Sequence, residues 1–269
     1  MTVTRQEVVG PYATVQIQST DPDALTKWLT ENGYAIGEDV KPIVRQYVRE
    51  NFNFLALRLK PGASVQSMRP VRVTSRGPSV VLPLRMVAAG AGANVGITLW
   101  TMAEGRYEPQ NFPWFRIADE DVAWDWTKDG SNFRDVRAQK TAETFGRGWE
   151  LESSVAIQSG AFPVAAQRFG GGFGGAPQPG ASGASLGYEA DGAKSPDQVL
   201  AEDISVLYDG RSGTSRLTRM RADLAKNLLS EDLVLTASPD QALLTNQRQI
   251  TRELNEPACT VWVLSLIHI

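Results

Sequence analysis

The sequence predicts an α+β fold, in which two or more amphipathic helices pack on a largely antiparallel sheet. Several segments alternate apolar and polar residues with a period of two, which is typical of strands. Two segments near the N-terminus instead place apolar residues at helical spacing. One strand, two helices and then several strands follow one another, and this order favours α+β over a regular α/β alternation. A Gly/Ala/Pro-rich tract over residues 158–196 interrupts both patterns.

The N-terminal part begins with a predicted strand over residues 13–19. A helix should follow, because Thr20 or Asp21 can cap its N-terminus and Pro22 fits its first turn. Gly33 suits the position just after the end of this helix. Its apolar stripe consists of Leu25, Trp28 and Leu29.

A second amphipathic helix is predicted over residues 38–50, followed by a strand over residues 52–60 in which Leu55, Leu57 and Leu59 alternate with polar or smaller residues. The apolar positions of the helix recur at the spacing of one helix face. They are Val40, Ile43, Val44, Tyr47 and Val48.

Residues 78–102 form the longest apolar tract and are predicted to contain two core strands, with a short strand over residues 69–74 leading into them. Arg85 interrupts one side of the first strand. The apolar residues that share a side are Val80, Leu82, Leu84 and Met86 in the first strand and Val95, Ile97 and Leu99 in the second.

Downstream, residues 104–117 predict an ordered loop with a short strand. The tract over residues 158–196 has a composition that cannot bury enough apolar surface to fold, so we predict a flexible insertion. Leu217, Met220, Leu224 and Leu228 have helical spacing, and we favour a helix there over an edge strand. Two further strands are predicted over residues 232–237 and 259–263.

These patterns divide the chain into a core domain over residues 1–157, the insertion, and a segment over residues 197–263 that returns to the core. The last six residues, LSLIHI over residues 264–269, correspond to the translation of a transposase end sequence used as a sequencing adapter. We therefore predict an artefact there. His268 is the only histidine, so the authentic segment would have no histidine base or metal ligand.

Composition excludes some functions. The net charge of −3 argues against a nucleic-acid binder, which would carry a basic face. No apolar run reaches the length of about 18 residues that a membrane helix needs. The N-terminus also lacks the basic and apolar order of a signal peptide.

Carboxylates cluster over residues 119–129, and this run is the best candidate site. Asp125, Thr127, Asp129 and Gly130 match the first half of an EF-hand loop, whose oxygen ligands suit calcium. Phe133 and Val136 then stand where the later ligands belong. Calcium is therefore the one cofactor considered, with Asp125 and Asp129 as candidate ligands and a solvated acidic loop as the alternative.

Tryptophans lie beside the same acids. Trp114, Trp124 and Trp126 could face a ligand such as a sugar, although packing is the commoner role of indoles. Glycosidases pair two carboxylates with aromatic walls, so Glu104 and Glu108 together with these acids leave a hydrolase as an alternative. No catalytic residue can be assigned from the sequence.

Five phrases occur in order over most of residues 8–240: VGPYATVQIQSTDPDALTKWLTENGY, VLPLRM, GITLWTMAEGRYEPQNFP, LTRMRADL and DLVLTA. Together they resemble a bacterial family called domain of unknown function 2330. The resemblance implies an exported protein, secreted or held in the cell envelope, of which this chain would be a fragment truncated at both ends. It would give Cys259, the only cysteine, a disulfide partner in the missing part.

The family has no established activity to carry over. We therefore expect a non-catalytic envelope domain that binds or scaffolds, with a carboxylate-dependent envelope hydrolase acting on glycans as the alternative. The partner is unknown.

Overall fold

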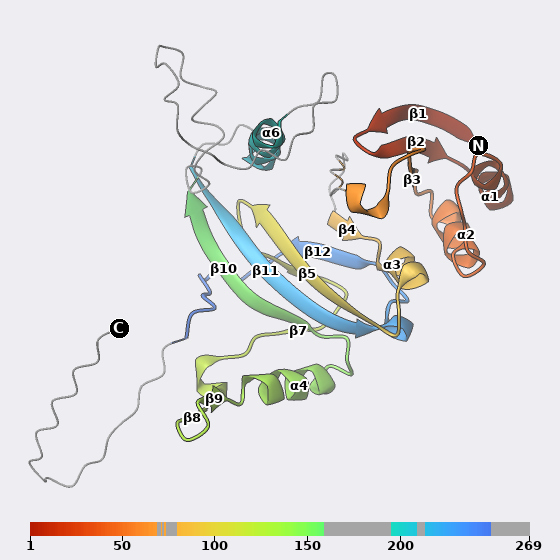
Figure 1. The fold of residues 1–269 in the computed structure, drawn as a ribbon. Coiled ribbons are helices and arrows are strands. Elements are labelled where there is room, and N and C mark those ends of the chain that lie inside the picture. The colour runs from red at the N-terminus through yellow and green to blue at the C-terminus, as the bar shows by residue number, and fades with distance from the viewer. Residues whose placement is uncertain (69–70, 72, 74–79, 159–194, 209–212, 249–269) are drawn as a thin grey trace, which may run out of the picture.

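The computed structural model describes the chain except for residues 69–70, 72, 74–79, 159–194, 209–212 and 249–269. Two lobes lie side by side (Figure 1). The N-terminal lobe is a three-stranded antiparallel sheet, in the order β1-β2-β3, with two helices on one face. Its elements are β1 Thr2–Val9, β2 Tyr12–Gln18, α1 Pro22–Glu31, α2 Lys41–Arg49 and β3 Phe54–Leu59.

The first helix ends where its residues predict. The carboxylate of Asp21 accepts hydrogen bonds from the backbone N–H groups of Asp23 and Ala24 at 2.9 and 3.1 Å, which caps the N-terminus of α1. Gly33 follows the helix with a φ of +77°, a left-handed conformation that favours glycine. The apolar faces of the two helices then cover β2 in a core of Val15, Ile17, Leu25, Leu29, Val44 and Val48.

Two features of this lobe differ from expectation. Strand β1, which the sequence did not predict, pairs with β2 along its length. In β3, Phe54 and Ala56 pack against the core, whereas Leu55 and Leu57 lie on the outer side and are 36% and 38% exposed. The strand itself was predicted, but Phe54 and Ala56 take the buried side because they are paired with the core residues of β2.

The C-terminal lobe is built from two sheets with a core between them. The larger sheet has the order β5-β11-β10-β7 and the smaller has the order β4-β12-β6. All pairs are antiparallel except β10 with β7. The larger sheet comprises β5 Asn94–Ala103, β11 Thr214–Ala225, β10 Trp149–Gln158 and β7 Trp114–Phe115, and the smaller comprises β4 Val80–Leu82, β12 Leu233–Ala237 and β6 Tyr107–Pro109.

Long-range pairing fixes the inward side of the large sheet. Met220 and Leu224 of β11 are fully buried and lie opposite Leu99 and Val95 of β5. The side that Val95, Ile97 and Leu99 share is therefore the side of β5 that packs on the core. The core of this lobe contains Leu84, Ala88, Phe112, Trp149, Leu151, Met220, Ala222, Leu224, Leu229, Leu233, Leu235 and Leu244.

The structure of the first half of the long apolar tract differs from the prediction. Only Val80–Leu82 is a strand, β4, and the chain then forms helix α3, Leu84–Gly90, where a strand was predicted. Pro83 has no N–H to continue the ladder, and the residues after it are good helix formers. Within α3, Leu84 and Ala88 enter the core of the C-terminal lobe while Met86 packs on that of the N-terminal lobe. The helix therefore joins the two cores.

The predicted helix through Leu217 to Leu228 is also wrong. Residues Thr214–Ala225 form β11, the strand between β5 and β10. Apolar residues at 217, 220 and 224 fit a helical spacing, but the buried residues are the alternating Thr218, Met220, Ala222 and Leu224. Because β5 and β10 provide hydrogen-bonding partners on both edges, the segment forms a strand and its buried residues alternate with a period of two.

The remaining elements flank the large sheet. Within residues 104–117 one short strand was predicted and two occur, β6 and β7. The strand predicted over residues 232–237 is confirmed as β12, while helix α4 and strand β10 were not predicted. The flanking elements are β8 Trp124–Asp125, β9 Gly130–Ser131, α4 Phe133–Glu143 and α6 Pro196–Tyr208. Short 3₁₀ turns also occur at Val65–Ser67, Asp119–Asp121 and Lys226–Leu228.

The architecture confirms the predicted α+β class. The strand predicted over residues 69–74 falls largely outside the described residues, and so do most of the Gly/Ala/Pro-rich tract, the strand over 259–263, Cys259 and the segment with His268. Within the described ranges, no helix combines the length and apolar character needed to cross a membrane.

Candidate functional site

The acidic run forms a tight hairpin. Trp124 and Asp125 of β8 pair with Ser131 and Gly130 of β9. One carboxylate oxygen of Asp125 accepts hydrogen bonds from the backbone N–H and the hydroxyl of Thr127, at 2.9 and 2.6 Å. This local turn, typical of aspartate, reverses the chain.

The hairpin gives limited support for a cation site. The second carboxylate oxygen of Asp125 lies 3.2 Å from the ammonium of Lys128. The hydrogen bonds from Thr127, with that from Lys128, lower the pKa of Asp125. Phe133 and Val136, at the later ligand positions, belong to helix α4. No cluster of three or more His, Cys, Asp or Glu residues suited to a metal occurs in the described part of the chain. Calcium binding at Asp125 and Asp129 stays a prediction.

The neighbouring acids are held by basic side chains. Asp119 lies 3.1 Å from Arg248, and Asp121 lies 3.1 Å from Lys140. The backbone N–H of Ala118 also donates to Asp121, and this bond is the main cause of the lowered pKa of Asp121. These contacts tie the acidic segment to α4 and to the chain beyond β12.

The candidate aromatic residues are only partly brought together. The rings of Trp124 and Trp126 meet edge to face, with centroids 6.2 Å apart. Trp126 is 51% exposed at the hairpin. Trp114 is 38% exposed and lies on β7, where it pairs with Trp149 of β10. Trp124 and Trp126 thus form one aromatic surface, and Trp114 belongs to a different strand.

The acids considered for a hydrolase also lie on different elements. Glu108 is on β6 and pairs with Thr236 of β12, whereas Asp121 and Asp125 lie at the hairpin beside α4. The pKa values of Glu50, Asp121, Asp125, Asp232 and Asp240 are all lowered. A glycosidase general acid needs a raised pKa instead. The hydrolase alternative therefore gains no support and stays a prediction.

A buried ionic cluster joins the two lobes, and the sequence did not predict it. The guanidinium of Arg85, on α3, makes two hydrogen bonds to Glu50 at 2.8 and 2.6 Å. It also donates to Asp232 at 2.6 Å, and the hydroxyl of Tyr47 donates to the other oxygen of Asp232 at 2.7 Å. The guanidinium lies over the Tyr47 ring, 4.3 Å from its centroid.

Burial and charge act in opposite directions on the cluster. Burial alone would raise the pKa of Asp232, but the hydrogen bonds from Arg85 and Tyr47 outweigh it and lower that pKa. Burial and the bond to Asp232 raise the pKa of Tyr47. A permanently charged arginine, an ionised aspartate and a neutral tyrosine are thus the stable forms. The one signal in the sequence was Arg85, a charge inside the longest apolar tract.

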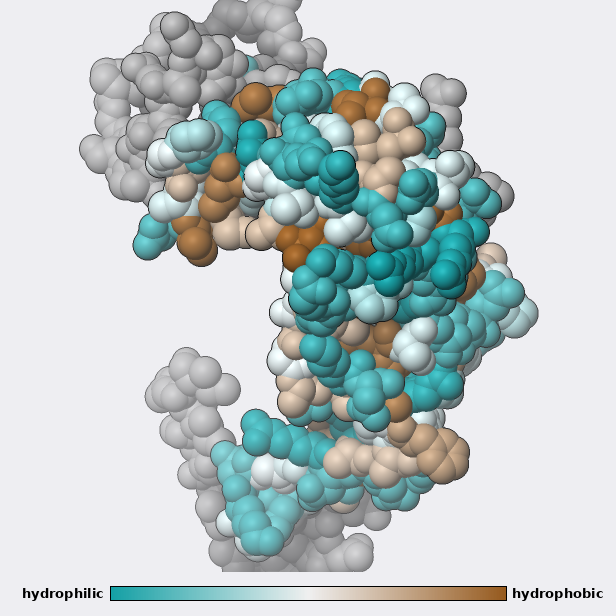
Figure 2. All heavy atoms as spheres, turned by 90° about the vertical axis from the view of Figure 1, so that its right-hand side faces the viewer, coloured by the Kyte–Doolittle hydropathy of each residue, from teal (hydrophilic) through white to brown (hydrophobic). Residues whose placement is uncertain are grey.

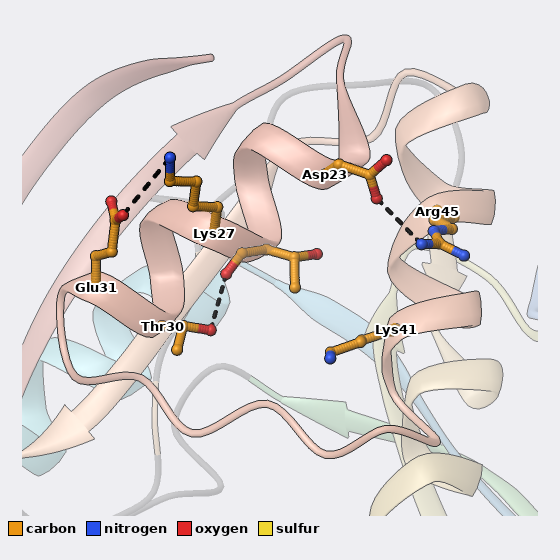
Figure 3. Close-up of a pocket in the computed structure, with 7 residues that line it drawn as sticks. Asp23, Lys27, Thr30, Glu31, Lys41 and Arg45 are labelled. Carbon is orange, nitrogen blue, oxygen red and sulfur yellow. Dashed lines mark hydrogen bonds and ion pairs between the residues drawn. The ribbon is translucent and has the colours of Figure 1, made fainter.

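A shallow groove of about 460 Å³ lies between α1 and α2 (Figure 3). Its charges are paired: Arg45 lies 3.1 Å from Asp23 across the groove, and Lys27 lies 3.9 Å from Glu31. The side of the molecule that carries these helices is mainly hydrophilic, with smaller hydrophobic patches (Figure 2). The full lining is Asp23, Thr26, Lys27, Thr30, Glu31, Lys41 and Arg45.

Comparison with known proteins gives a family and no activity. The sequence model of a family described as uncharacterized protein conserved in bacteria, domain of unknown function 2330, matches residues 1–161. The match ends just after β10, so it covers the N-terminal lobe and only part of the large sheet. No curated protein and no solved structure matches the chain.

Proposed function

Because the chain belongs to this uncharacterized bacterial family, domain of unknown function 2330, we propose that it is a non-catalytic binding domain of the cell envelope. The family resemblance supports the location. The non-catalytic role is supported by one observation above all: the buried carboxylates of Asp232 and Glu150 are bonded to arginines. An ionised, paired carboxylate holds the fold together and is not available as a general acid.

The architecture also suits a binding role. Two separate cores are joined by α3 and by the Arg85 cluster, which stabilises a fixed arrangement of the lobes. The aromatic side chain of Trp100, on β5 of the large sheet, remains 54% exposed. Exposed aromatics on a rigid scaffold are typical of binding surfaces.

Cell fractionation tests the location. The natural gene would be expressed in its own bacterium with an epitope tag, and the periplasmic or surface fraction would be separated from the cytosol. The proposal predicts the tagged protein in the envelope fractions with Cys259 oxidised. Recovery in the cytosol with a free thiol would contradict the proposed location.

Co-sedimentation tests the binding role. The purified chain would be mixed with isolated envelopes from the same bacterium and centrifuged. The proposal predicts saturable recovery of the chain in the pellet. A chain that stays in the supernatant over the whole concentration range would not be an envelope-binding domain.

A further inference from the structure

The outer face of the large sheet carries a continuous row of side chains from three strands and one helix. Trp100 of β5 lies opposite Arg219 of β11, and the guanidinium is 5.2 Å from the centroid of the indole. The Nε of Arg219 lies 2.7 Å from Glu152 of β10. Arg137 of α4 reaches the other oxygen of Glu152 at 3.3 Å and Glu150 at 2.5 Å.

A β-bulge contributes to this row. The register between β10 and β11 shifts between Leu151 and Ser153, and Glu152 is the residue at the shift. Bulges redirect a side chain and recur next to functional sites. Here Glu152 is within reach of arginines from two different elements.

The row is most exposed at its β5 end. The side chains of Glu152, Arg137 and Arg219 are 10%, 24% and 31% exposed, and Trp100 is 54% exposed. In the described chain, Arg219 contacts Glu152 through Nε, and no hydrogen bond there uses its terminal nitrogens. The exposed end of the row is therefore an indole with the Arg219 guanidinium over its ring.

We propose that this row, the Trp100 platform, binds the pyranose rings of a neutral glycan. The inference rests on the proposed binding role and names its ligand class. A pyranose has a flat C–H face that stacks on an indole, and its rim carries hydroxyls that accept and donate hydrogen bonds. Arg219 and the indole N–H would donate hydrogen bonds to those hydroxyls.

The charges of the row favour this ligand over others. Two arginines are balanced by two glutamates, so the surface has no excess charge to attract an anionic or cationic polymer. A purely apolar partner would cover Arg219 without satisfying its N–H groups, which is unfavourable. A neutral polyhydroxyl ligand can stack on the indole of Trp100 and also accept hydrogen bonds from the N–H groups of Arg219.

Isothermal titration of the purified full chain with chitotetraose and with cellotetraose tests the proposal. We expect binding of at least one tetrasaccharide, and a loss of affinity of about tenfold or more in Trp100→Ala, as for an aromatic hot spot. Trp126→Ala is the matched control, because Trp126 is 51% exposed and lies at the hairpin. Trp100→Phe, which keeps a smaller ring, should fall between wild type and Trp100→Ala. Circular dichroism would verify that each variant folds.

Each other outcome overturns the proposal. Wild-type protein that binds neither tetrasaccharide has no such glycan platform. Equal losses in the two alanine variants, or a loss in Trp126→Ala alone, would place the ligand elsewhere. Envelope co-sedimentation separates this failure from failure of the proposed function. Sedimentation that persists in Trp100→Ala would leave a binding domain that uses another surface. Sedimentation that protease treatment of the envelope abolishes would leave a binding domain with a protein partner.

Discussion

Replacing Arg85 by methionine removes the charge that links the two lobes. The side chain is 10% exposed and bonds to Asp232, which is 6% exposed, and to Glu50, which is 39% exposed. Methionine keeps much of the apolar volume of the arginine stem, so the main loss is the ionic cluster and its stacking on Tyr47.

The magnitude follows from burial. Removing one partner of a buried ion pair costs about 3–5 kcal/mol, because the other charge is left uncompensated. Asp232 would keep its bonds from the Tyr47 hydroxyl and from the backbone N–H of residue 85, which places the loss at the lower end. The bond to half-exposed Glu50 adds at most about 1 kcal/mol. We expect the free energy of unfolding to fall by about 3 kcal/mol.

Urea denaturation followed by tryptophan fluorescence measures this loss without the ionic screening of guanidinium. Arg45→Met is the matched control, since Arg45 and its partner Asp23 are 52% and 77% exposed and the pair lies 3.1 Å apart. Its loss should be about 0–1 kcal/mol. If Arg85→Met costs no more than Arg45→Met, the cluster does not hold the lobes together.

Other perturbations have similarly defined outcomes. Asp232→Asn should make the loss of stability in acid less steep. The lowered pKa of Asp232 gives a stabilisation that is complete above the unfolded pKa of about 3.9 and is lost as pH falls through the folded pKa. Thermal melts of wild type and variant that stay parallel below about pH 4 would refute this. The raised pKa of Tyr47 predicts a stabilisation that is present below an unfolded pKa of about 10 and is lost as pH rises through the folded pKa. Tyr47→Phe should therefore remove one group that ionises at high pH from the absorbance titration of the tyrosines. An unchanged titration curve would contradict this assignment. Asp21→Ala should cost about 1 kcal/mol in urea denaturation through loss of the α1 cap, and a change within error would show that the cap is dispensable. Any calcium binding at Asp125 should be weak, with a Kd of about 10⁻³ M or higher, because the bidentate ligand is missing. A micromolar Kd measured by calorimetry, and abolished by Asp125→Asn, would contradict this expectation.

Local signals predicted local structure. The boundaries of α1 follow from Asp21 and Gly33, whose capping roles depend on a few neighbouring residues. The inward side of β5 follows from alternation at Val95, Ile97 and Leu99. These elements could be predicted because one face of each packs on a core and the apolar period records that face.

Structure that depends on distant partners could not be predicted in the same way. The spacing of Leu217, Met220 and Leu224 fits a helix, and only pairing with β5 and β10 makes the segment a strand. Arg85 and Asp232 are 147 residues apart, and nothing in the sequence pairs them. Tertiary pairing decides between local alternatives of similar propensity.

The same distinction between local and distant contacts holds for the candidate site residues. Trp124 and Trp126 are two residues apart, and their contact at the hairpin follows from a local turn. The row of Trp100, Arg219 and Glu152 joins three strands whose order in the sheet, β5-β11-β10, differs from their order in the chain. Sequence reading therefore found the local aromatic surface and missed the one that the sheet assembles.

The most direct test of the account is co-sedimentation of the purified chain with insoluble chitin and with cellulose, which are both neutral glycans. Wild-type protein and Trp126→Ala should pellet with the glycan, soluble tetrasaccharide should release them, and Trp100→Ala should stay in the supernatant. A wild-type chain that remains soluble, or a Trp100→Ala chain that pellets as wild type does, would contradict the claim that this family member is a glycan-binding envelope domain.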